Sequence, residues 1–275
     1  MADAAGPLII IGGLEDKEDQ RVILKAVAER LNGGRLVIAT VASHTREGYF
    51  DSYVSAFGAL GVTDLVELYV EDRSQEEIAS AVAVLDGAAG LFFTGGDQLR
   101  LSSLIGRTAV ETRIQALHAA GGVVAGTSAG ASAMSETMLV KGASKGSYRI
   151  GELHMAPGLG LLGGVIIDQH FAERGRFGRL LGAVAHNPRL LGVGVDENTA
   201  LVVESERFDV IGSGAAYVVD GGGVSHVNIA EAKPEQALSL FDVRMHVLSS
   251  GDSFDLSARR PEGGCHEAGS RPPKG

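Results

Sequence analysis

Cysteine, long apolar runs and basic charge are scarce in this 275-residue sequence, and each shortage excludes a class of protein. The single cysteine, Cys265, excludes an intramolecular disulfide and a zinc site built from cysteines. The apolar runs are far shorter than the ~20 residues that a membrane-spanning helix needs, so we expect no membrane partner. Lys and Arg total 24 against 34 Asp and Glu, a formal charge of −10. We therefore expect no nucleic-acid partner, because such a chain has little with which to neutralise phosphates.

The N-terminal residues include no basic residue before the first apolar stretch, which is not the pattern of a secretory signal. We therefore expect a cytoplasmic protein. Apolar residues make up 45% of the chain and charged residues 21%, a balance that permits a sizeable core and excludes a disordered chain. Glycine has about twice its usual share, and several glycine pairs stand at the ends of apolar runs, where tight strand-to-helix turns occur.

The first two-thirds of the chain alternate short apolar runs with amphipathic stretches. The runs predict buried strands at residues 8–11, 36–39, 65–70, 91–93 and 123–125. Helical patterns occupy residues 22–31, 74–85 and 108–119. Strands that are apolar on both faces and separated by helices indicate an α/β fold, with a mainly parallel central sheet and helices on both faces. Ligands of such sheets bind at the carboxyl ends of the strands.

Closely spaced short strands replace this alternation from about residue 191 onward. They are predicted at residues 201–203, 209–211, 217–219 and 245–248, and we expect them to be antiparallel and to extend the sheet or flank it. After Gly251 the sequence becomes polar and contains Arg-Arg-Pro and Pro-Pro. We therefore expect residues 1–251 to form a single domain and residues 252–275 to form a flexible tail.

Residues 126–130, Gly-Thr-Ser-Ala-Gly, fit the pattern G-x-S-x-G directly after a predicted strand. The small residues that follow permit a helix, and a sharp strand-to-helix turn presents its serine, here Ser128, as a nucleophile. Backbone N–H groups beside such a turn suit an oxyanion, and we expect those of Gly96 and Ala129 to serve. The alternative is a structural glycine-rich turn with an incidental serine.

A serine nucleophile needs a base and an acid that orients the base. Among the 8 histidines, His170 stands at the carboxyl end of an apolar run at residues 165–167, so we expect it at the same sheet edge as Ser128. Asp196 and Glu197 both end a later buried run, and the residues alone leave the choice of acid open. The chain order Ser, His, acid differs from that of α/β-hydrolases.

Three arginines, Arg174, Arg176 and Arg179, follow the candidate base. Guanidinium groups suit carboxylates, so these residues are candidates to bind an acidic substrate; a solvated helix face is the alternative. Residues 158–163 match the dinucleotide motif G-x-G-x-x-G, but a proline precedes them and a strand follows. We therefore expect no nucleotide cofactor, and no metal, because no set of His, Asp and Glu has the spacing of ligands.

Together these motifs resemble the cyanophycinase family of serine peptidases, which is related in fold to aspartyl dipeptidase and more distantly to class I glutamine amidotransferases. The matching segments are residues 12–17, 93–98, 126–131, 166–171 with Arg174, and 194–200. The most specific is Asp-Gln-His-Phe at residues 168–171 with its trailing arginines. The resemblance covers about residues 8–219. The sequence departs from the family pattern at residues 12–14, where it has Gly-Gly-Leu in place of an all-glycine run.

The resemblance implies a cofactor-free homodimer with Ser128 as nucleophile, His170 as base and Glu197, rather than Asp196, as acid. It implies an exopeptidase whose substrate is cyanophycin, a polyaspartate chain with arginine amide-linked to each β-carboxyl. Cleavage through an acyl-enzyme would release β-aspartyl-arginine dipeptides. Asp168 is a candidate partner for a substrate guanidinium. The expected substrate-binding residues are Gln98, Thr127, Asp168, Gln169, Arg174, Arg176 and Arg179.

Three rival functions fit parts of the same sequence. An α-aspartyl dipeptidase would use the same serine, although the arginines beside His170 favour the polymer. A catalytically silent binding protein would keep the fold without the chemistry. A nicotinamide-dependent reductase would have to bind its cofactor through the glycine motif discounted above.

Overall fold

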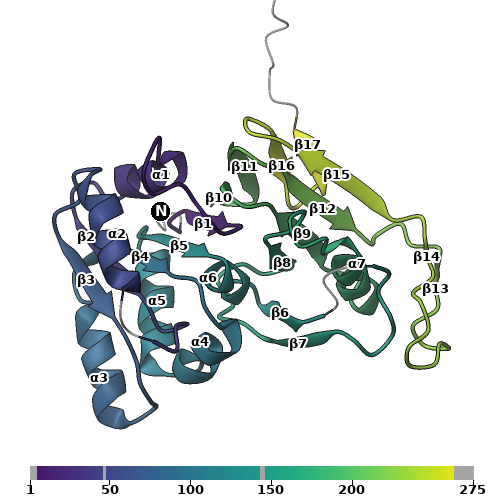
Figure 1. The fold of residues 1–275 in the computed structure, drawn as a ribbon, viewed down its shortest axis with the longest axis horizontal. Coiled ribbons are helices and arrows are strands. Elements are labelled where there is room, and N and C mark those ends of the chain that lie inside the picture. The colour runs from purple at the N-terminus through teal and green to yellow at the C-terminus, as the bar shows by residue number, and fades with distance from the viewer. Residues whose placement is uncertain (1–4, 46–47, 143–145, 263–275) are drawn as a thin grey trace, which may run out of the picture.

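The computed structural model describes residues 5–45, 48–142 and 146–262, and most of its strands belong to two sheets (Figure 1). The parallel half of the larger sheet runs, in spatial order, through β1 (Leu8–Ile11), β5 (Val123–Thr127), β4 (Ala88–Phe93), β2 (Arg35–Ala39) and β3 (Leu65–Leu68). These are the strands predicted from the apolar runs, and the α/β class with a largely parallel sheet is confirmed.

Helices cover both faces of this parallel half because its strands are apolar on both sides. Alternate residues of β1 face opposite ways: Ile9 and Ile11 join one buried cluster, and Leu8 and Ile10 join the other. The first cluster is completed by α1 (Val22–Arg30) and α2 (Tyr49–Gly58). The second is completed by α3 (Gln75–Val84), α4 (Gln98–Ile105) and α5 (Ala109–Ala119).

Antiparallel strands extend the larger sheet beyond β1. They are β10 (Thr199–Glu204), β11 (Arg207–Gly212), β16 (Ser253–Asp255) and β17 (Arg260–Glu262). The prediction of a tail from residue 252 is therefore wrong for residues 252–262. Phe254 is fully buried and stacks on Phe208 with 5.5 Å between the ring centroids. Burying such a side chain contributes about 1.5–3 kcal/mol, which favours pairing of this otherwise polar segment. Residues 263–275 of the expected tail lie outside the described residues.

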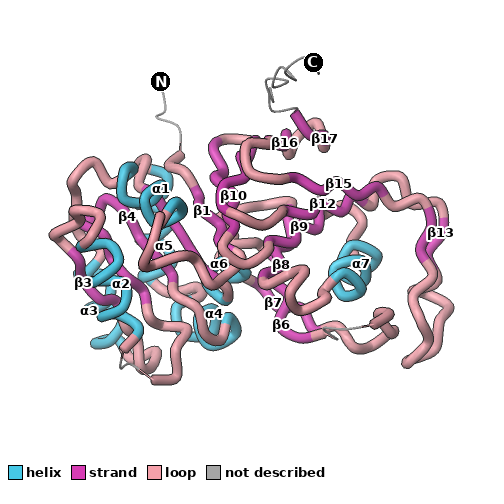
Figure 2. The backbone as a smooth tube through the Cα atoms, turned by 45° about the horizontal axis from the view of Figure 1, so that its top comes forward, coloured by secondary structure: helices cyan, strands magenta, loops and turns pink. Residues whose placement is uncertain are grey.

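A second, four-stranded sheet contains β15 (Arg244–Leu248), β12 (Ala216–Asp220), β9 (Leu191–Val195) and β8 (Val165–Gln169). Strands β8 and β9 are parallel, and α7 (Phe177–His186) packs against them (Figure 2). The antiparallel strands expected toward the C-terminus thus divide between the two sheets. Strand β8, expected in the same sheet as β5, belongs to the second one, so residues after β5 and after β8 approach from different sheets.

Short elements complete the fold. Helix α6 (Ala129–Ala133) follows β5 directly, β6 (Thr137–Lys141) pairs with β7 (His154–Pro157), and β13 (His226–Val227) pairs with β14 (Leu240–Phe241). The G-x-G-x-x-G sequence lies in the connection between β7 and β8. Among the residues the structure describes, no helix has both the length and the hydropathy required to cross a bilayer.

Candidate active site

Ser128 stands at the junction between β5 and α6, as the G-x-S-x-G pattern predicts. Its backbone has φ 53° and ψ −112°, a conformation that residues with side chains rarely adopt. The neighbouring glycines are required by close packing, because a Cβ on Gly126 would lie 2.7 Å from the backbone of Gly130. The turn leaves Ser128 partly exposed while Thr127 and Ala129 on either side are buried.

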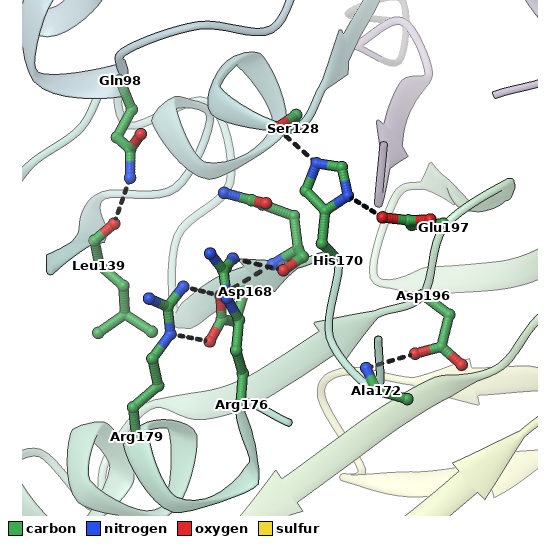
Figure 3. Close-up of polar contacts among 11 residues, drawn as sticks. Gln98, Ser128, Leu139, Asp168, His170, Ala172, Arg176, Arg179, Asp196 and Glu197 are labelled. Carbon is green, nitrogen blue, oxygen red and sulfur yellow. Dashed lines mark hydrogen bonds and ion pairs between the residues drawn. The ribbon is translucent and has the colours of Figure 1, made fainter. Parts of the chain in front are cut away.

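His170 and Glu197 complete a chain of hydrogen bonds with Ser128 (Figure 3). The Ser128 Oγ atom lies 2.9 Å from Nε2 of His170, and Nδ1 of the same ring lies 2.6 Å from Oε1 of Glu197. Because Glu197 can accept only from an N–H at Nδ1, it favours the tautomer in which Nε2 accepts from the serine hydroxyl. Residues on three strand ends from two sheets thus meet at one point.

The neighbouring carboxylates Asp196 and Glu197, between which the residues alone did not choose, have different contacts. Asp196 is buried and accepts the backbone N–H groups of Ala172, at 2.9 Å, and Ala215, at 3.2 Å. It therefore ties the loop after β8 to the connection between β11 and β12. Glu197 is the one whose carboxylate contacts the imidazole. The structure thus brings Glu197 into contact with the ring, and its role as the acid of the triad stays a prediction.

His170 is 5% exposed, and burial lowers the pKa of its imidazole below the ordinary value of 6.5. The hydrogen bond that His170 donates to Glu197 opposes this shift, and the nearby positive charge of Arg174 adds to it. Since an acid–base group must be unprotonated to accept a proton, a lowered pKa leaves the ring competent as a base at neutral pH.

We expect the pH dependence of kcat/KM to report this shift. The rate should rise with pH as His170 loses its proton and should reach its plateau with an apparent pKa below 6.5. In Glu197→Gln the midpoint should move lower still, because the contact that raises the pKa of His170 is weakened. Initial rates measured across the acidic and neutral range test this expectation, and an acid limb centred above 6.5 would contradict it.

Asp168, Arg176 and Arg179 form a buried ionic cluster beside the triad (Figure 3). Asp168 is completely buried; Nη1 of Arg176 lies 3.2 Å from its Oδ1, Nε of Arg179 lies 2.6 Å from its Oδ2, and Nη2 of Arg179 also contacts Oδ1. Arg176 donates a further hydrogen bond to the backbone oxygen of Gln169 at 2.5 Å. Burial lowers the pKa of Arg176 to about 10. Asp168 is thus directed at two arginines of this chain rather than outward, because their charges offset its desolvation.

The other residues expected to bind substrate occupy varied surroundings. Arg174 is exposed, and Gln98 is half-buried with its Nε2 donating to the Leu139 carbonyl at 2.8 Å. Thr127 is buried and its hydroxyl donates to Glu15 at 2.5 Å. Gln169 is buried, and its Oε1 lacks a hydrogen-bond partner among the described residues, as does Nε of Arg176.

The segment Gly95-Gly96 lies beside the serine, as an oxyanion donor must. A Cβ on Gly95 would lie 3.5 Å from the Cβ of Ser128 and 3.9 Å from its Oγ. Asp97 fixes the direction of this segment, because its carboxylate caps α4 by accepting from the N–H of Leu99 at 2.8 Å.

Glu15 is a feature of the site that the sequence reasoning did not single out. It lies four residues beyond the end of β1, is 4% exposed, and contacts the residue before the serine. The available signal was an acidic residue close behind the glycine pair that ends a buried strand, but acidic residues in such loops are usually exposed.

An α/β fold with a serine on a strained strand-to-helix turn, backed by histidine and a carboxylate, defines the class of serine hydrolases. Comparison with known proteins places the chain within that class. A profile of peptidase family S51 matches residues 8–211. Cyanophycinase from Geminocystis herdmanii is 38% identical over 94% of this chain and 97% of its own length, and cyanophycinase from a Nostoc species is 37% identical over 92% and 86%. The chain belongs to peptidase family S51 and is a serine peptidase homologous to cyanophycinases.

Solved structures support the fold independently. A peptidase from an acI-B1 actinobacterium aligns with a TM-score of 0.67 over 93% of this chain and 98% of its own, at 21% identity. A putative peptidase E from Listeria monocytogenes aligns with a TM-score of 0.52 over 76% of this chain and 99% of its own, at 18% identity. At these identities the likeness concerns the fold alone.

Proposed function

We propose that this protein hydrolyses the backbone of cyanophycin and releases β-aspartyl-arginine dipeptides. The observation that carries the proposal is the continuous contact from Ser128 Oγ through the His170 ring to Glu197, at 2.9 and 2.6 Å. The choice of substrate is supported by relatives named cyanophycinase, which are 36–38% identical over more than nine-tenths of the chain.

In the first step, Nε2 of His170 takes the proton from Ser128 while Oγ attacks a backbone aspartyl carbonyl carbon. Glu197 holds the Nδ1–H and stabilises the imidazolium that forms. We assign the oxyanion to the N–H groups of Gly96, in the loop after β4 and next to Gly95, and of Ala129, at the start of α6. One such donor typically lowers the barrier by about 3–4 kcal/mol.

In the second step, the tetrahedral intermediate collapses, the backbone C–N bond breaks, and His170 gives its proton to the leaving amine. The acyl group stays on Ser128 as an ester. Water, deprotonated by His170, then attacks the ester and restores the serine hydroxyl. The half-exposed position of Ser128 supports this route, because both the polymer and water need access to the ester.

We propose two kinds of contact with the substrate. Arg174, whose side chain is exposed, is suited to a free carboxylate of the polymer. Gln98 and Gln169 are suited to amide groups of the substrate. Oε1 of Gln169 and Nε of Arg176 have no hydrogen-bond partner among the described residues, and each such buried atom costs about 1–3 kcal/mol. A polar group of the substrate bound to these atoms would offset that cost. Arg176 and Arg179 act through the cluster with Asp168, in which two guanidinium groups and one carboxylate leave a net positive charge next to Gln169. We assign Thr127 a supporting place because its hydroxyl is occupied by Glu15.

Purified protein should release β-aspartyl-arginine from insoluble cyanophycin and should leave α-aspartyl dipeptides intact. Mass spectrometry of the soluble products identifies the released species, and Ser128→Ala protein is the control for contaminating peptidases. Hydrolysis of α-aspartyl dipeptides alone would transfer the assignment to the dipeptidase. Hydrolysis of neither would favour a binding protein on the same fold.

The expected homodimer and cytoplasmic location remain predictions. Light scattering of the purified protein in solution tests the first, and fractionation of cells that produce it tests the second.

A further inference from the structure

Three consecutive backbone carbonyls, from the last residue of β1 and the two residues after it, hold the three arms of the triad together. The carbonyl of Ile11 accepts from the N–H of Ser128 at 3.0 Å, and that of Gly12 accepts from the N–H of His170 at 2.8 Å. The carbonyl of Gly13 accepts from the N–H of Asn198, the residue after Glu197, at 2.8 Å. We call residues 11–13 the template segment. Because each arm comes from a different strand end, the template segment sets the distances between them.

The glycines of the template segment are required by close contacts with His170 and with the backbone immediately before Glu197. A Cβ on Gly13 would lie 2.3 Å from Cε1 of the His170 ring, and the residue has φ 113°. A Cβ on Gly12 would lie 2.0 Å from the carbonyl oxygen of Asp196. The histidine ring therefore rests directly on the template segment, and a displacement of the segment would displace the ring.

Glu15 anchors the chain that leaves the template segment. Its Oε1 accepts from the Tyr53 hydroxyl at 2.6 Å, its Oε2 accepts from the Thr127 hydroxyl at 2.5 Å, and Lys17 Nζ lies 3.1 Å from Oε1. Lys17 also lies over the Tyr53 ring, 4.6 Å from its centroid. Burial and the Glu15 carboxylate raise the pKa of Tyr53 well above its ordinary value, so its hydroxyl stays a donor.

A carboxylate whose side chain is 1% exposed is costly to bury unless it is hydrogen-bonded and paired. Here the bonds join two parts of the active site, because Thr127 immediately precedes Ser128 and Glu15 follows the segment that supports His170. A carboxylate that only stabilised the core would not need to connect the template segment with the turn that carries Ser128.

We propose that Glu15 is a positioning residue, which fixes the template segment against the serine turn and so holds Ser128 and His170 within hydrogen-bonding distance. The proposal rests on the function proposed above for the triad. A carboxamide cannot reproduce the arrangement, because its NH₂ group would replace one of the acceptors that face two hydroxyl donors and an ammonium group.

The test compares Glu15→Gln with Asp220→Asn, a matched control at the far end of the second sheet. Asp220 is also a buried carboxylate paired with a cation, Arg259 at 2.8 Å. It lies away from the triad, because it is opposite Leu191 at the start of β9, whereas Glu197 follows the end of that strand. Each protein is treated with a fluorophosphonate, whose phosphorus is attacked by an activated serine oxygen to give a phosphonyl-serine while fluoride and the serine proton are released, and the labelling rate is measured. Unfolding temperature, kcat and KM on cyanophycin are measured in parallel.

Glu15→Gln should label about 10- to 100-fold more slowly than wild type, with kcat reduced similarly and KM little changed, because small displacements of reacting groups have effects of this size. Asp220→Asn should lose thermal stability and keep the wild-type labelling rate. If Glu15→Gln does not fold, the labelling rate of Thr127→Val tests the proposal instead, because this variant removes the hydrogen bond between Thr127 and Glu15.

A folded Glu15→Gln protein that labels at the wild-type rate would overturn the proposal, even if its unfolding temperature falls. If Glu15→Gln does not fold, a Thr127→Val protein that labels at the wild-type rate would also overturn the proposal. Wild-type protein that labels but leaves cyanophycin intact would contradict the proposed substrate alone, since the labelling rates would still decide the role of Glu15. Wild-type protein that does not label would contradict both.

Discussion

Ser128→Ala should lower the rate of cyanophycin hydrolysis by on the order of 10⁴- to 10⁶-fold, because it removes the atom that forms the acyl-enzyme. The fold should survive, since the side chain removed is small and partly exposed and contributes one hydrogen bond, to His170. The substitution should not relieve the backbone strain at φ 53°, because alanine has the same steric constraint as serine in this conformation. Dipeptide release measured over long incubations gives the residual rate.

The unfolding temperature of Ser128→Ala is the necessary control. An unchanged unfolding temperature with lost hydrolysis separates a chemical role from a structural one. Hydrolysis within tenfold of the wild-type rate would contradict a serine mechanism, because no residual route through the oxyanion donors is expected to approach that rate.

Glu197→Gln should lower kcat by about 10³- to 10⁴-fold, the loss seen when the acid of a comparable triad is replaced by its amide. A glutamine can present its NH₂ group to Nδ1, which stabilises the tautomer with the proton on Nε2. That nitrogen could then no longer accept the proton of Ser128. The 2.6 Å contact with Nδ1 is the observation on which this expectation depends. Single-turnover assays measure the effect on acylation directly.

The neighbouring carboxylate supplies a control one residue away. Asp196→Asn should reduce stability more than activity, because Asp196 accepts two backbone N–H groups and the structure gives it no contact with the imidazole. One acceptor oxygen survives the change, so the protein should still fold. If Asp196→Asn instead lost activity while Glu197→Gln kept it, the acid of the triad would be misassigned.

Local sequence was sufficient to predict the parts of the site that depend on local structure. The strand before Ser128 and the turn after it follow from an apolar run and small residues, and both are present. The position of His170 at a strand end follows in the same way. The choice of Glu197 over Asp196 needed the family resemblance, because adjacent carboxylates differ only in the direction that the loop gives them.

Features that depend on distant contacts could not be predicted in this way. Which sheet β8 joins is decided by pairing with β9, and an apolar strand carries no mark of its neighbour. Arg176 and Arg179 have the spacing of a helix face, which also suits a solvated surface; only the fold brings both to Asp168. The pairing of β16 with β11 depends on burial of Phe254 within an otherwise polar stretch.

The most direct test of the account is to identify the residue that carries the adduct after the protein is treated with a fluorophosphonate. Peptide mapping by mass spectrometry should find a single modified residue, Ser128, and the adduct should be absent from the Ser128→Ala protein. An adduct on a different residue, or an unmodified Ser128 in folded wild-type protein, would contradict a nucleophile activated by His170 and Glu197.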